Sequence, residues 1–167
     1  MALQLFKIAS TTVETPQATI LFSNIPQGYT DLKLVFSPRT TRNTGDASSI
    51  SVTLNGSTTS RSSRILYGNG SAAYSYTDTI LEGGFAAQNT GTTANVYSSH
   101  EYYFPNYTSS NYKSMSFDSV HENNATNAYA LMTAGLWSNT AAITSITLEC
   151  LTFNFVAGTT ATLYGVL

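Results

Sequence analysis

The 167-residue chain is poor in charge, since 10% of its residues are Asp, Glu, Lys or Arg, against about 25% in an average soluble protein. Its net charge of −2, with seven basic residues spread over the whole length, offers no basic stripe to neutralise phosphates and argues against nucleic acid as a partner. No apolar run approaches the roughly 18–20 residues of a membrane-crossing helix, and residues 1–10 lack the regions of an export signal, so we expect no membrane partner.

Apolar and polar residues alternate with the period of a β-strand along most of the chain. The segments with this pattern are, in chain order, 18–23, 31–36, 50–54, 63–68, 95–104, 113–120, 128–137, 143–155 and 161–167. Turn signals rich in Gly, Asn and Pro separate them. The segment 128–137 is also compatible with a short helix, but Gly135 in its interior favours a strand. The pattern predicts one all-β domain over 1–167, an antiparallel β-sandwich of about nine short strands, with the jelly roll as the favoured topology.

Three segments have further expectations of their own. The segment 71–95 has the weakest alternation and is predicted to be a long loop outside the sandwich, where binding surfaces tend to lie. The segment 161–167 is predicted to be a strand inserted between other strands, because pairing there would bury its apolar residues. Cys150 cannot form an internal disulfide and is expected to be a small buried hydrophobe.

Two histidines, His100 and His121, are each followed by glutamate, a pair of residue types that suits zinc. The metalloprotease spacing is absent, because Phe104 and Ala125 stand where the second histidine would be. If 95–104 and 113–120 pair as a hairpin, His100 falls opposite the neighbourhood of Ser116 and far from His121. We therefore expect no metal site, and histidines that are solvated or hydrogen-bonded at strand ends.

The remaining catalytic patterns give no support to an enzyme. There is no nucleophile elbow, phosphate-binding loop or dinucleotide fingerprint in the sequence. A Ser/His/Asp triad could be assembled from the many serines, but no spacing selects one. The acidic residues are scattered singly, so no carboxylate pair for glycoside hydrolysis is indicated. The prediction is a protein without catalytic residues and without a cofactor.

Four of the seven basic residues form two close pairs, Arg39 with Arg42 and Arg61 with Arg64. Arginine is enriched at protein interfaces and binds carboxylates with two parallel hydrogen bonds, so all four are candidate interface residues. The alternative is that they are solvated loop residues.

Tyrosines are concentrated between residues 97 and 112 among Ser and Asn. This mixture is typical of adaptable recognition surfaces, so Tyr102, Tyr103 and Tyr107 are candidate contact residues. The alternative is that their rings form cross-strand pairs in the core.

Three segments in the same order resemble a group of tailed-phage virion proteins. They are 24–42, with an Ile-Pro…Tyr-Thr-x-Leu motif before an arginine-bearing loop, 54–70, with an Asn-Gly turn and a Tyr-Gly-x-Gly stretch, and 143–167, with Leu-Tyr-Gly near its end. Members of this group are capsid decoration (cement) proteins or tail and fibre components. The segment 71–126 matches no motif of the group, so the position in the virion stays open.

The resemblance implies a non-enzymatic virion structural protein, assembled in the host cytoplasm. The leading expectation is a capsid decoration protein that binds the major capsid protein, forms a homotrimer on threefold lattice sites and lays residues 1–17 as an arm on the capsid or a neighbouring subunit. The runner-up is a tail fibre or receptor-binding protein that recognises host-surface glycan through the tyrosine-rich segment. A polysaccharide-cleaving enzyme is the least favoured class.

Overall fold

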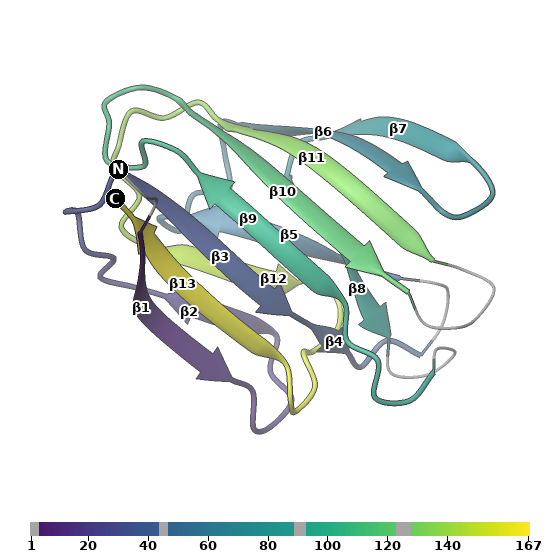
Figure 1. Ribbon diagram of the computed structural model, residues 1–167. Helices are drawn as coiled ribbons and strands as arrows, with labels where there is room; N and C mark the ends of the chain where they lie inside the picture. Colours follow the sequence, from purple (N-terminus) through teal and green to yellow (C-terminus); the bar gives the residue numbers. More distant parts are fainter. Residues whose placement is uncertain (1–3, 44–46, 89–92, 123–127) are drawn as a thin grey trace.

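The computed structural model describes residues 4–43, 47–88, 93–122 and 128–167, and these residues form strands and loops without a helix. Thirteen strands build two sheets that stack face to face (Figure 1). The predicted antiparallel β-sandwich is confirmed, with more strands than the number expected from the alternation. The jelly roll stays a prediction, because the sheet order establishes a sandwich and nothing narrower.

The larger sheet has eight strands, and every neighbouring pair is antiparallel. In spatial order they are β1 (Leu5–Thr12), β13 (Thr160–Val166), β3 (Asp31–Ser37), β9 (Ser99–Phe104), β10 (Lys113–His121), β11 (Tyr129–Trp137), β6 (Arg61–Gly68) and β7 (Ala73–Asp78). This sheet faces the viewer in Figure 1, with β7 at its far edge.

The smaller sheet has five strands and lies behind the larger one. In spatial order they are β2 (Thr19–Phe22), β12 (Ile146–Cys150), β5 (Ser48–Leu54), β8 (Leu81–Gln88) and β4 (Arg39–Thr40). The pairs are antiparallel apart from β4 with β8, which run parallel.

The core lies between the sheets and follows from the two-residue period of the strands. In β10, Met115 and Phe117 point inward and are buried, while Ser116 and Asp118 point away from the other sheet and are exposed. The inward side chains of both sheets form one apolar cluster, which contains the fully buried Trp137. This arrangement leaves the opposite face of the larger sheet without a covering layer.

The predicted position of the last strand is confirmed. Strand β13 lies between β1 and β3 and pairs antiparallel with both. Leu163 and Val166 are buried, as expected for a strand that is hydrogen-bonded on each side.

Two predictions about segment boundaries are wrong. The segment 71–95 is not a long loop, because most of it forms β7 and β8. The weak alternation of β8 has a local cause: Gly83 and Gly84 lie where its pairing with β5 shifts register. Within the predicted N-terminal arm 1–17, Leu5–Thr12 form β1, an edge strand of the chain's own sheet, while residues 1–3 lie outside the described residues.

The predicted hairpin of 95–104 with 113–120 is confirmed as the β9–β10 pair. Its register differs from the prediction, because His100 lies opposite Ser119 and Tyr103 lies opposite Ser116. The turn between β9 and β10 is therefore centred later in the chain than the sequence predicted.

Candidate protein interface

The four candidate interface arginines lie in different surroundings. Arg39 is 4% exposed, and its guanidinium donates hydrogen bonds to the backbone carbonyls of Thr93 and Val96 at 3.2 and 2.7 Å. Burial lowers the pKa of Arg39 from its ordinary value. The prediction of an interface role is wrong for Arg39, because the chain's own backbone already occupies this side chain.

Arg42 and Arg61 are half-buried and are also engaged within the chain. The Arg42 guanidinium lies over the ring of Phe153, 5.5 Å from its centroid. Arg61 donates to the hydroxyl of Thr53 at 3.1 Å. Of the four arginines, Arg64 is the one with an exposed side chain, and it lies on the outward face of β6.

The three candidate tyrosines also divide. Tyr102 and Tyr107 are fully buried, so their predicted role in a recognition surface is wrong. Their hydroxyls donate to the backbone carbonyls of Gly83 and Pro26, respectively. Tyr103 is half-buried on the outward face, and its hydrogen bond to the carboxylate of Asp31 raises the pKa of Tyr103 to about 12. Successive strand residues face opposite ways, so adjacent tyrosines have opposite surroundings.

His100 belongs to a hydrogen-bonded network inside the core. Its Nε2 lies 3.0 Å from the hydroxyl of Ser98, and its Nδ1 lies 3.0 Å from both the Gly83 carbonyl and the Tyr102 hydroxyl. Burial lowers the pKa of His100 to about 4, so the ring is neutral near pH 7. The hydrogen-bonded alternative is confirmed for His100, and the solvated one is wrong.

Glu82 is a buried acid that no pattern in the sequence indicated. Its side chain is 2% exposed, and burial, followed by the charge of Asp78, raises the pKa of Glu82 to about 8. Perturbed groups of this kind often mark active sites. Here Glu82 and His100 are both almost fully buried.

His121 lies at the end of β10, is 1% exposed and stacks on the ring of Tyr129 at 6.4 Å. In the part of the chain that the structure describes, no three His, Cys, Asp or Glu side chains are grouped to hold a metal ion. In the same part, no helix is long and apolar enough to cross a bilayer.

The surface feature that stands out is apolar and lies on the outward face of β6, β10 and β11. We call it the outer patch, and it consists of Leu66, Val120, Ala130, Met132, Ala134 and Leu136. Three of these side chains are more than half exposed, Leu66 at 56%, Val120 at 53% and Met132 at 61%. Large apolar side chains gathered on one face of a soluble protein mark a contact surface.

The outer patch follows from a strand that is apolar on both faces. In β11, Leu131 and Trp137 point into the core, while Met132 and Leu136 point outward. A strand on the surface of a sandwich normally alternates apolar with polar. The signal in the sequence was therefore the lack of polar residues at every second position of 129–137.

Strand register arranges the outer patch in rows across the sheet. Leu66, Met132 and Asp118 form one row. Gly68, Ala130 and Val120 form the next, and Arg64, Ala134 and Ser116 form the row on the other side. The row with the large side chains of Leu66 and Met132 therefore lies next to the row with the small residues Gly68 and Ala130.

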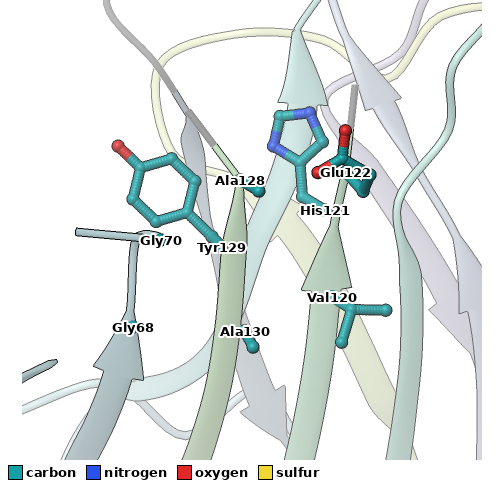
Figure 2. Close-up of a pocket in the computed structure, with 8 residues that line it drawn as sticks. All are labelled: Gly68, Gly70, Val120, His121, Glu122, Ala128, Tyr129 and Ala130. Carbon is teal, nitrogen blue, oxygen red and sulfur yellow. The ribbon is translucent and has the colours of Figure 1, made fainter. Parts of the chain in front are cut away.

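The small residues leave two shallow hollows of about 340 Å³ each, which share Gly68 and Ala130. Figure 2 shows Ala130 on the strand between those of Gly68 and Val120. Leu66 and Met132 line the second hollow, together with Ala73 of β7. The outer patch therefore has both protruding side chains and a depression, so a partner with a complementary shape could pack against it.

A second surface feature is an aromatic cluster to which β6, β7 and β8 each contribute a ring. The ring of Tyr67 lies 5.0 Å from that of Tyr74, in a stacked arrangement, and 5.6 Å from that of Phe85. Tyr74 is 44% exposed. Tyr74 and Phe85 belong to the segment 71–95, in which a binding surface was expected.

Comparison with protein-family models, curated proteins and solved structures finds no match for this chain.

Proposed function

We propose that the chain is a non-enzymatic structural protein of a phage virion, a capsid decoration protein that is held in its assembly through the outer patch. The observation that carries this proposal is the group of exposed Leu66, Val120 and Met132 on one face of the larger sheet. The resemblance of 24–42, 54–70 and 143–167 to tailed-phage virion proteins supports the setting.

The chemistry of the outer patch suits a protein contact. Interfaces are enriched in Met and depleted in Lys and Glu, and the six residues of the patch carry no charge. Covering the patch would remove apolar surface from water, which contributes roughly 25 cal/mol per Å². Two exposed charged residues, Arg64 and Asp118, border the patch.

The position in the virion is tested by labelling the protein and imaging virions by electron microscopy. We expect the label over the head. A label confined to the tail would overturn the decoration role.

The role of the outer patch is tested by Met132→Glu, which places a charge at its centre. We expect occupancy on the virion to fall at least about tenfold, because a buried unpaired carboxylate is costly, while the melting temperature stays within a few degrees. Leu21→Glu is the matched control, because Leu21 is also 61% exposed but lies on the smaller sheet. Equal occupancy of both variants and the parent protein would contradict the proposal.

A second candidate function, recognition of host-surface glycan by a tail protein, is favoured by the aromatic cluster. Exposed tyrosine rings offer apolar faces for sugar rings and hydroxyls for hydrogen bonds. Tyr74→Ala should then abolish binding on a glycan array, while Tyr112→Ala, a change of a 62% exposed ring in the loop between β9 and β10, should not. Binding that is absent in the parent protein would exclude this candidate.

A further inference from the structure

We infer that the partner of the outer patch is a second copy of this chain, packed face to face about a twofold axis parallel to β11. The inference rests on the proposed function, because it names the partner of the same surface. It follows from the arrangement of the rows, from two exposed charges of opposite sign and from the size of the face.

The twofold axis makes the surface complementary to itself. A rotation of 180° about this axis keeps each row at the same position along the strands. It places β6 of one copy over β10 of the other, because these two strands flank β11. Val120 of one copy then faces Gly68 of the other, where the hollow lies. Met132 of one copy meets Met132 of the other on the axis. Val120 therefore finds a depression and Met132 a flexible apolar partner, while Leu66 lies opposite Asp118.

The same rotation brings opposite charges together. Arg64 and Asp118 are exposed on the outward face, and neither forms an ion pair with another described residue of its own chain. Within one chain, their Cα atoms are two strand spacings and one step along the strands apart, about 12 Å in all, and both side chains point outward side by side. In the pair of chains, Asp118 of the second copy lies opposite Leu66, across the gap of about 10 Å between facing sheets and one step of about 7 Å along β6 from Arg64, so the two side chains point toward each other. The arginine and aspartate side chains together span this distance of about 12 Å, and the symmetry forms the contact twice.

The size of the face sets the expected strength. The face that the rotation pairs spans β7, β6, β11, β10 and β9, and it measures about 27 Å along the strands and about 24 Å across them, on the order of 650 Å². Stable interfaces bury about 800 Å² on each partner. We therefore expect reversible association that depends on protein concentration, which allows the effect of single substitutions to be measured.

The test is analytical ultracentrifugation of the purified chain over a range of concentrations. We expect the mass of one chain at low concentration and of two chains at high concentration. Arg64→Asp and Asp118→Arg should each weaken association by at least about tenfold, because each places like charges together. The double variant should return to within about threefold of the parent, because the reversed pair is again complementary.

Lys7→Asp is the matched control, since it makes the same change of charge on exposed Lys7 at the opposite edge of the sheet. It should leave the association unchanged. A chain that stays monomeric, a mass of three chains, or a double variant no better than the single ones would overturn the twofold contact. The threefold mass would match the trimer that the resemblance implies.

The virion experiment separates this inference from the proposed function. If Met132→Glu lowers virion occupancy while the purified chain is monomeric, the function stands and the second copy is wrong. If the chain dimerises as described while Met132→Glu leaves occupancy unchanged, the dimer stands and the role of the outer patch in attachment is wrong.

Discussion

Single polar residues in the core have a local cause in the backbone. The pairing of β5 with β8 shifts register between Ser49 and Ser51, opposite Gly83 and Gly84. A bulge leaves backbone groups outside the ladder, and a buried carbonyl without a partner is costly. The Tyr102 hydroxyl donates to the Gly83 carbonyl, and His100 Nδ1 lies 3.0 Å from the same oxygen. These two side chains complete the hydrogen bonding that the bulge interrupts.

Tyr102→Phe tests this interpretation. The variant keeps the ring in the core and removes the hydroxyl, so the Gly83 carbonyl loses a donor. We expect the free energy of unfolding to fall by about 1–3 kcal/mol, measured by urea denaturation. Tyr112→Phe, at a 62% exposed ring, should change it by less than about 0.5 kcal/mol. Equal values for the two variants would contradict the role assigned to Tyr102.

Glu82 makes stability depend on pH in a direction that its raised pKa determines. The folded chain keeps the Glu82 proton up to about pH 8, whereas the unfolded chain releases it near the ordinary value of 4.5. The folded state binds more protons between these values, so stability falls as the pH rises through them. His100 acts in the opposite direction, but only between about pH 4 and pH 6.5.

The interval from pH 6.5 to pH 8 therefore isolates Glu82. One proton changes the free energy of unfolding by about 1.4 kcal/mol per pH unit, so the parent should lose roughly 2 kcal/mol over this interval. Glu82→Gln, which keeps the shape and cannot ionise, should show a flat profile. Denaturation series at several pH values provide the measurement, and parallel profiles for the two proteins would rule out a buried neutral Glu82.

At the scale of elements, β8 depends on close approach to the opposite sheet. Gly84 has φ of +99°, and a Cβ placed there would lie 2.0 Å from the Ser119 hydroxyl. Both the backbone conformation and the contact therefore require glycine. This close approach is also why β8 contacts β10 so tightly within the core.

Gly84→Ala should lower the free energy of unfolding by about 2–5 kcal/mol, as the sum of a left-handed backbone and an overpacked contact. Gly56→Ala is the matched control, because Gly56 has φ of +68° with nothing within 4 Å of an added Cβ. It should cost only the backbone part, about 1–2 kcal/mol. Thermal or urea denaturation compares them, and a milder effect at Gly84 than at Gly56 would be incompatible with the packing described.

At the scale of the whole molecule, Cys150 reports on cooperative opening. It lies in β12, in the interior of the smaller sheet, is 2% exposed, and burial raises the pKa of its thiol to about 11. A buried neutral thiol does not react. Labelling with a thiol reagent should therefore be negligible in buffer and complete in denaturant, with a protection energy equal to the free energy of unfolding. Faster labelling in buffer would show that β12 opens locally.

The sandwich could be predicted from the sequence because most strands bury one face, and a buried face leaves a two-residue period. The period fails in β8, where Gly83 and Gly84 contribute no side chain, so β8 was missed. The two-residue period also does not show which face of a strand points inward. A shift of one residue would exchange the buried position of Tyr102 with the outward position of Tyr103. The outer patch was missed because β11 is apolar on both faces. Such a strand has no apolar–polar alternation, so its sequence does not show that one apolar face is exposed.

The placement of β13 between β1 and β3 has a consequence for folding during synthesis. Among the described strands, β1 has a single neighbour in the sheet, and that neighbour is β13, so β1 waits for residues 160–166 to be synthesised before it can pair. Until then one edge of β3 is also open. Contacts between such distant segments make folding slow, typically milliseconds to seconds for sandwiches, and an open edge invites pairing with other chains. The nascent chain therefore gains most from chaperone protection just before residues 160–166 emerge from the ribosome.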